Sequence, residues 1–129
     1  MTVLEHPTAV AAVALAALVL SAAPASAGGD DVQRHGSCTG STHWKLKAGP
    51  DDGRIEVEGE VDSNRSGQTW TWRLVHNGSV SVRGTRTTQG PSGSFEVHRR
   101  VVDLAGSDRL VLRASNPRTG EVCHGTVRM

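Results

Sequence analysis

Two cysteines and two neighbouring histidines are the residues whose type and spacing could do chemistry. His35 stands three positions before Cys38, and His124 directly follows Cys123. If the two ends of the domain meet, these four side chains form the two-histidine, two-cysteine set that holds zinc in many proteins. Against this set, neighbours on a strand point to opposite faces, so Cys123 and His124 would point apart.

The same two cysteines can instead form a disulfide. They are the only cysteines in the chain, and an exported protein meets an oxidising compartment in which such pairs are bridged. Cys38 shares the alternation phase of Trp44 and Leu46, and Cys123 shares that of Val127, so both sulfurs would point inward. We therefore predict a Cys38–Cys123 disulfide, with the zinc site as the alternative.

Export is indicated by the N-terminal segment. Residues 9–20 read AVAAVALAALVL and are all apolar, whereas about 20 such residues are needed to span a bilayer. Ala25-Ser26-Ala27 then offers the small-x-small pattern that signal peptidases accept. We expect a signal peptide at 1–27, a flexible mature N-terminus at 28–37 and one β-domain at 38–129, secreted without a stable membrane anchor.

The charge balance narrows the class of partner. The chain has 14 Lys+Arg against 13 Asp+Glu, a net charge of +1 at pH 7. A strongly electrostatic binder of nucleic acid or membranes needs a clear basic excess. We expect a monomer with no cofactor and no nucleic-acid partner, which meets an unidentified extracellular partner.

The predicted domain reads as strands, because apolar and polar residues alternate and no long stretch has helical periodicity. Arg54–Asp62 is the clearest strand, with an acidic face opposite an apolar one. Asn77-Gly78 predicts a two-residue hairpin turn between strands at 68–76 and 79–87, the second with Val80 and Val82 inward. The other expected strands are 42–48, 109–114, 121–129 and one that begins at Phe95 and has a β-bulge at Arg99-Arg100.

Seven short strands separated by turn residues predict an all-β fold, an antiparallel seven-strand sandwich of immunoglobulin-like form. A small up-and-down β-barrel is the alternative. Trp70 and Trp72 alternate in phase with Leu74, so we expect them in the core rather than on a sugar-stacking platform.

Charged side chains gather on individual strands. The acidic row Glu56, Glu58, Glu60 and Asp62, with Asp51 and Asp52, could bind Ca²⁺. We expect a solvated face instead, partly neutralised by Lys45 opposite Glu56 and His43 opposite Glu58, after a turn at 49–53. The later strands are basic and could meet an anionic partner such as a cell-wall polymer, but we expect ordinary surface charge instead. The basic residues are Arg73, Arg83, Arg86, Arg99, Arg100, Arg109 and Arg113.

The sequence predicts no catalytic residues. The nucleophile motif G-x-S-x-G is not present, because Gly90-Pro91-Ser92-Gly93-Ser94 has its last glycine misplaced. A catalytic triad could still assemble from residues that are distant in the sequence. The leading interpretation is a secreted, non-enzymatic β-domain that acts as an extracellular binding module. The alternatives are a protease-inhibitor-like protein that presents the loop Gln89–Ser94, and a small secreted enzyme or metal-binding protein.

The segment from Cys38 to Trp70, CTGSTHWKLKAGPDDGRIEVEGEVDSNRSGQTW, resembles a family of small secreted actinobacterial proteins with no assigned function. The likeness continues through Pro91–Phe95 and Thr119–Cys123. The resemblance implies export and a β-rich domain, and it brings no catalytic or binding residues with it.

Overall fold

The computed structural model describes Thr2, Val3 and residues 31–129. The predicted signal peptide therefore lies outside the described residues, apart from Thr2 and Val3. No helix among the described residues is long and apolar enough to cross a membrane. Every named element in the described part of the chain is a strand.

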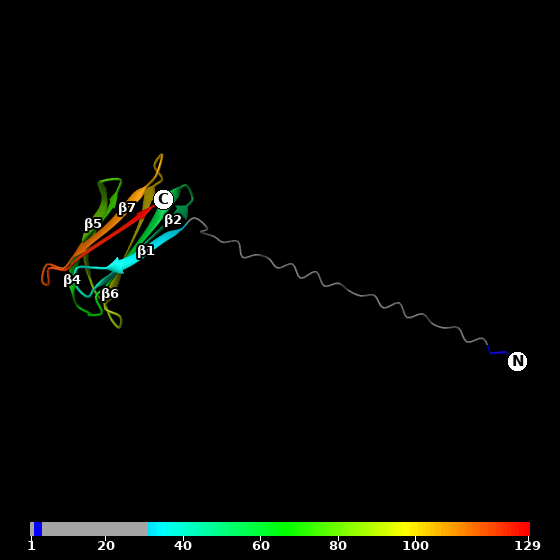
Figure 1. The fold of residues 1–129 in the computed structure, drawn as a ribbon, viewed down its shortest axis with the longest axis horizontal. Helices are drawn as coiled ribbons and strands as arrows, with labels where there is room; N and C mark the ends of the chain where they lie inside the picture. The colour runs from blue at the N-terminus through cyan, green and yellow to red at the C-terminus, as the bar shows by residue number, and fades with distance from the viewer. Residues whose placement is uncertain (1, 4–30) are drawn as a thin grey trace.

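The strands are β1 (Val32–Ser37), β2 (His43–Asp51), β3 (Arg54–Asp62), β4 (Thr69–His76), β5 (Ser79–Thr87), β6 (Ser94–Val102), β7 (Arg109–Ser115) and β8 (Val122–Arg128). They form two antiparallel sheets of four strands, in the orders β1-β2-β3-β6 and β5-β4-β7-β8. Alternate side chains of both sheets meet in one core, which includes Leu46, Ile55, Trp70 and Leu112. The predicted all-β class is confirmed, with all of the named strands in two antiparallel sheets (Figure 1).

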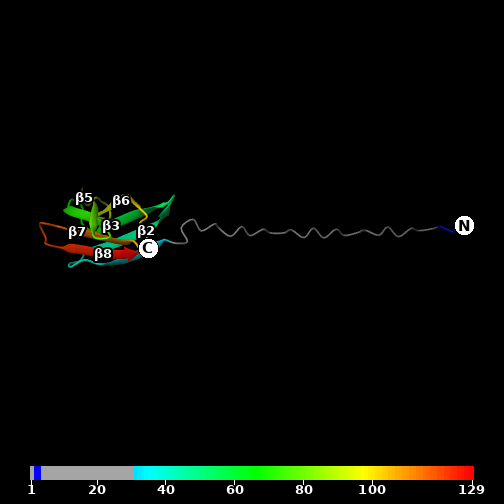
Figure 2. The same ribbon diagram turned by 90° about the horizontal axis from the view of Figure 1, so that it is seen from above.

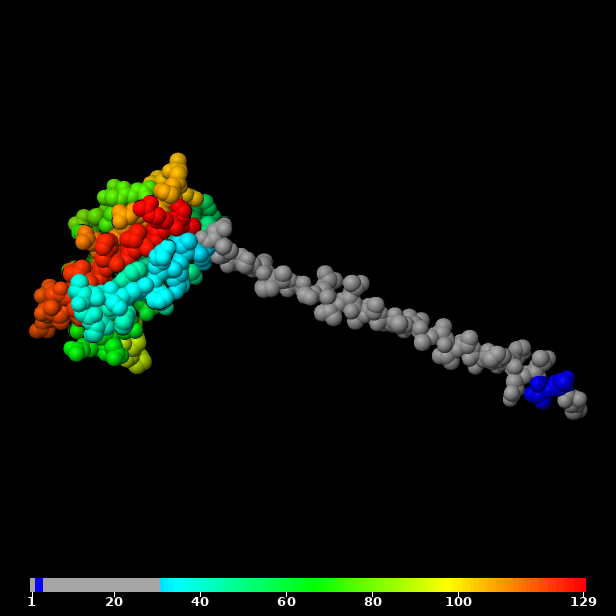
Figure 3. Space-filling view, in the orientation of Figure 1, coloured from blue at the N-terminus to red at the C-terminus, as the bar shows by residue number. Residues whose placement is uncertain are grey.

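The two sheets leave one pair of edge strands on each side of the sandwich. Figure 2 shows β5 and β6 on one side, with β1 and β8 on the other. Figure 3 shows β1 and β8 side by side along their length. Trp44 packs on this seam against Gly36 and Gly125, where a Cβ on Gly125 would lie 2.4 Å from the indole ring. The indole and the Cys38–Cys123 disulfide together close this side.

Eight strands are present where seven were predicted. The additional strand, β1, lies in the segment 28–37 that we expected to be flexible. It pairs with β2 from Val32↔Ala48 to Ser37↔His43. Its sequence, VQRHGS, has no apolar alternation, because Val32 is the one large apolar residue on the face toward the core and Arg34 and Gly36 take the other positions of that face. The pairing with β2, rather than a local pattern, therefore defines this strand.

The predicted bulge at Arg99-Arg100 is wrong. β6 pairs with β3 in one unbroken register from Ser94↔Asp62 to Val102↔Arg54. Phe95, Val97 and Val101 are buried at alternate positions, and Arg99 takes the remaining inward-facing position. The alternation is intact, and a charged residue on an edge strand hides it.

The irregularity lies in the neighbouring sheet. The register of β4 against β5 shifts between Leu74 and Val75, where Leu74 pairs with Val82 and Val75 pairs with Val80. Ser81 is the extra residue, so the side chains of β5 change face at this point. Val82 packs against the core as predicted, but Val80 is 41% exposed.

The tryptophans of β4 occupy the core as expected. Trp70 is fully buried, Trp72 is 9% exposed and Leu74 is 2% exposed. The Trp72 ring lies against Gly84 of β5, whose missing side chain leaves room for it. Neither Trp70 nor Trp72 offers a free ring face for stacking on a sugar.

Candidate anion-binding face

Charge is divided unequally between the two sheets. The strands β4, β5, β7 and β8 contain no Asp, Glu or Lys, and six arginines, which are Arg73, Arg83, Arg86, Arg109, Arg113 and Arg128. All acidic residues that lie in strands belong to the other sheet, in β2, β3 and β6. A chain of nearly neutral net charge thus has one sheet with only basic charge.

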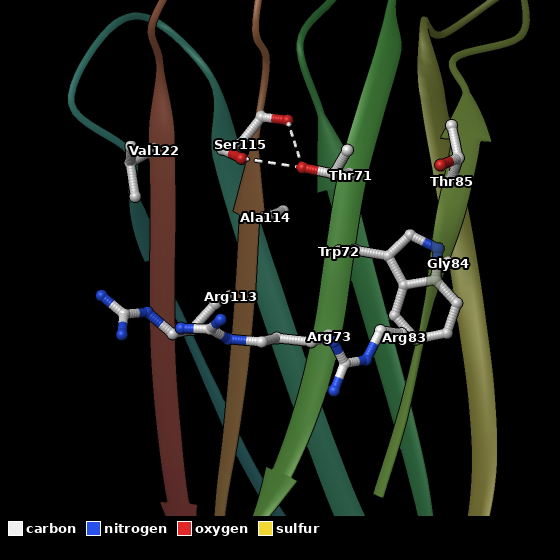
Figure 4. A pocket seen from close by; sticks show the side chains of 10 residues that line it. All are labelled: Thr71, Trp72, Arg73, Arg83, Gly84, Thr85, Arg113, Ala114, Ser115 and Val122. Carbon is white, nitrogen blue, oxygen red and sulfur yellow. Dashed lines mark hydrogen bonds between the residues drawn. The ribbon is translucent and has the colours of Figure 1, made fainter. Parts of the chain in front are cut away.

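Three of these arginines form a row across the sheet. Arg83 of β5 lies opposite Arg73 of β4, and Arg73 lies opposite Arg113 of β7. Neighbouring strands are about 4.8 Å apart, and like charges placed directly opposite destabilise a sheet. Figure 4 shows the three side chains in a line over the outer face. We call Arg73, Arg83 and Arg113 the arginine row; His124 of β8 lies opposite Arg113 and extends it.

The arginine row has no acidic partner among the described residues. The ion pairs within 4.0 Å in this part of the chain all involve other basic groups. Hydroxyl groups lie beside the row instead, and Thr71 Oγ1 is 2.9 Å from Ser115 Oγ. The row and these hydroxyls line a shallow concave surface of about 490 Å³.

A pair of arginines lies on the same face as the arginine row. Arg109 of β7 is opposite Arg128 of β8, four positions along β7 from Arg113. A guanidinium presents a planar fork that binds a carboxylate or a phosphate through two parallel hydrogen bonds. An outer face that presents several unpaired guanidiniums can therefore hold an extended anionic ligand.

The outer face of the other sheet carries the acidic row, with a register that differs from our prediction. β2 runs on to Asp51, and the turn is Asp52-Gly53, with φ values of 47° and 75°. Lys45 therefore lies opposite Glu60 and His43 opposite Asp62, four positions beyond the predicted partners. The predicted cross-strand arrangement of basic and acidic residues holds in this shifted register.

One group on this face has the spacing of a metal site. The ligand atoms of Glu56, Glu58 and His98 lie within 4.8 Å of one another. His98 Nδ1 is 3.7 Å from Glu58 and its Nε2 is 3.7 Å from Glu96, and the His98 side chain is 55% exposed. The group is an open surface cluster that is already partly paired.

We predict that Ca²⁺ leaves the melting temperature of the protein unchanged, because the acidic row is solvated and Lys47 lies opposite Glu58. A real site would stabilise the fold by about 2.7 kcal/mol at a hundredfold excess over Kd. A calcium titration followed by differential scanning calorimetry measures this directly, and a clear upward shift would contradict the prediction.

The structure does not bring the four alternative zinc ligands together. Cys38 and Cys123 are joined in a disulfide with a Cα–Cα distance of 4.3 Å, so neither offers a thiolate. Cys123 is buried while His124 is exposed on the opposite face of β8. His35 is exposed and lies opposite Lys45.

A buried histidine–aspartate pair is the feature that sequence reasoning missed. His76 Nε2 lies 2.6 Å from Asp108 Oδ1, and the Asp108 side chain is 2% exposed. Burial alone would raise the pKa of Asp108, but hydrogen bonds from His76 and from the Leu104 backbone N–H outweigh it and lower that pKa below 3.8. No local pattern links His76 to Asp108, because they lie on β4 and in the loop before β7.

The loop that a protease inhibitor would present is held in place but folded back. The Gln89 N–H donates to the Ser94 carbonyl at 3.0 Å, and the Ser94 N–H donates to the Gln89 carbonyl at 3.2 Å. Gly93 is buried against the backbone of Asn64 and Arg65. The exposed tip is thus a closed turn rather than the extended segment that a protease cleft accepts.

Comparisons with known proteins add no role to this geometry. No family model, no curated protein and no solved structure matches the chain. The site is therefore interpreted from its own chemistry, in which the arginine row is the most unusual arrangement.

Proposed function

We propose that this protein is a secreted, non-enzymatic binding domain that takes an anionic ligand on the outer face of the β5-β4-β7-β8 sheet. The observation that carries the proposal is the arginine row, in which three guanidiniums lie side by side without a carboxylate among the described residues. Such a row costs stability in the free protein. An anion laid across the row would remove that repulsion.

The separation of charge makes this face effective despite the low net charge. The potential near a surface depends on the local charges within about 8–10 Å at physiological salt. Basic charge dominates there, because the acidic residues of the strands lie in the other sheet. An anionic polymer would be attracted to one side of the domain only.

The proposed fold is immunoglobulin-like. Without β1, the strand orders are β2-β3-β6 and β5-β4-β7-β8, which correspond to three-strand ABE and four-strand C′CFG sheets. Trp70 is then the buried tryptophan of strand C, which is a hallmark of immunoglobulin domains. Domains of this architecture commonly serve as binding modules on cell surfaces and outside cells.

Secretion remains part of this proposal. The Cys38–Cys123 disulfide suits an oxidising compartment, where such bridges persist. The apolar segment at 9–20 and the small residues at 25–27 supply the export signal. A cell-wall polymer rich in phosphate or carboxylate is the kind of ligand such a protein would meet.

The test is binding of long-chain polyphosphate and poly-L-glutamate, measured by isothermal titration calorimetry at low and physiological salt. We expect binding that weakens with salt. Replacing Arg73, Arg83 and Arg113 together by glutamine should weaken it roughly a hundredfold, since each charge-assisted hydrogen bond contributes about 1 kcal/mol or more. The same triple variant should melt no lower than the wild type, because it relieves repulsion.

The matched control removes the same charge from the other sheet. It replaces Arg34, Lys45 and Lys47 by glutamine, three basic residues of β1 and β2. If this control loses as much affinity as the arginine-row variant, only net charge matters and the proposed face is wrong.

A further inference from the structure

The open side of the sandwich between β5 and β6 holds a second concave surface, separate from the arginine row. It has a volume of about 410 Å³ and lies where the start of β3, the β4–β5 hairpin and the end of β6 meet. We call it the edge notch, and its lining includes Arg54, His76, Val80, Arg99, Val102 and Leu104.

Three exposed aliphatic residues line the edge notch. Val80 is 41% exposed, Val102 is 56% exposed and Leu104 is 43% exposed. Among the described residues of the sandwich, Val122 is the one other large apolar side chain exposed to this degree. Scattered apolar residues are ordinary on a protein surface, whereas a group in one concavity marks a binding site.

Two unpaired arginines border these aliphatic groups. Arg99 occupies an inward-facing position of β6 between the buried Val97 and Val101, yet it is exposed on this edge strand. Arg54 begins β3 and lies opposite Val102. Neither arginine makes an ion pair with the described residues. An inward-facing charge can protect an edge strand, but protection does not require a second arginine beside an apolar patch.

Two residues that line the edge notch are hydrogen-bonded to one buried carboxylate, Asp108. Asp108 Oδ1 accepts hydrogen bonds from His76 Nε2 at 2.6 Å and from the Leu104 N–H at 3.2 Å. Two residues that line the notch are therefore held in place before any ligand arrives. Preorganisation of this kind lowers the entropy that binding must overcome.

We propose that the edge notch binds a carboxylate carried on an aliphatic chain. The guanidiniums of Arg99 and Arg54 receive the carboxylate, and the chain lies on Val80, Val102 and Leu104. The site is independent of the proposed anion-binding face, because it uses a different surface and requires an apolar group beside the charge. Fatty acids and the carboxyl ends of peptides both carry this chemistry.

Octanoate is a suitable probe, followed by amide chemical-shift changes in the ¹H–¹⁵N spectrum of the purified protein. We expect saturable changes around Val80, Val102 and Leu104, and the same region should respond to an acetylated Val-Leu peptide only if peptides are a source. Arg99→Gln should weaken octanoate binding roughly tenfold, the loss expected for one charge-assisted hydrogen bond. Because Arg99 is exposed, this variant should keep the fold.

Arg34→Gln is the matched control. Arg34 is also an exposed arginine at an inward-facing position of an edge strand, since it lies opposite Leu46, but it belongs to β1 on the other side of the sandwich. It should bind octanoate like the wild type. Three results would each overturn the proposal: equal octanoate affinity in Arg99→Gln and wild type, equal binding of octanol and octanoate, or chemical-shift changes confined to the arginine row. None of these results would disprove the proposed anion-binding face.

Discussion

Replacing Cys38 by serine is expected to lower the free energy of unfolding by roughly 2–5 kcal/mol, the loss seen when small secreted domains lose a bridge. The disulfide spans 85 positions of sequence, so its loss frees a long loop in the unfolded chain. It also ties the segment after β1 to β8, joining the two sheets along the seam that Trp44 covers. Urea unfolding of the oxidised protein measures the change.

The double variant Cys38→Ser/Cys123→Ser is the internal control, because either single change removes the same bond. All three variants should therefore have similar stability, and thiol labelling of the wild type should find no free sulfhydryl. His35→Ala and His124→Ala should cost little, since both histidines are exposed. Two labelled thiols with one equivalent of zinc would contradict the disulfide and restore the metal site.

Local patterns predicted the strands that alternate cleanly. β3 and β5 have the predicted bounds, Arg54–Asp62 and Ser79–Thr87. The Asn77-Gly78 turn is also confirmed, with φ values of 47° and 86°. These elements carry their own signal, because the alternation and the turn residues stand next to each other in the chain.

Long-range pairing explains what the sequence could not predict. β1 has no apolar alternation and is held by its pairing with β2. Arg99 occupies an inward-facing position of β6, which tolerates a charged residue there because β6 is an edge strand. The arginine row depends on the pairing of β4 with β7, which are distant in sequence. The seven arginines noted in the sequence therefore predicted that the later strands are basic, but they did not predict how these arginines are divided between the two sheets. Five of them are on the basic sheet, and Arg99 and Arg100 are on β6.

The acidic and basic faces follow from the order of the hairpins. The hairpin β2–β3 contributes most of the strand acids to one sheet, and the hairpins β4–β5 and β7–β8 contribute only basic charge to the other. Since each hairpin stays within one sheet, charge that is local in sequence becomes local to one face. The net charge of +1 is therefore the sum of an acidic face and a basic face on opposite sheets.

The pair His76–Asp108 should make the protein sensitive to acid. The pKa of Asp108 is lower in the folded protein than its ordinary value of 3.8, despite burial, because His76 and the Leu104 N–H stabilise the carboxylate. A carboxyl group with a depressed folded pKa contributes stability above its unfolded pKa and loses it as the pH falls through the folded pKa. The free energy of unfolding should therefore fall as the pH drops below about 4, where linkage places the change.

Asp108→Asn removes this charge while keeping the shape of the side chain. At pH 7 we expect the variant to be about 1–3 kcal/mol less stable than the wild type, the usual cost of weakening a buried hydrogen-bonded group. The difference should shrink on acidification, since the wild type then protonates the carboxyl that the variant lacks. Urea unfolding at several pH values between 2.5 and 7 gives both curves. The control is Glu96→Gln, which removes a carboxylate that is 62% exposed, and its free energy of unfolding at pH 7 should stay within about 0.5 kcal/mol of the wild-type value. If the wild-type and Asp108→Asn stability curves run parallel with pH, the buried carboxylate does not control the acid response.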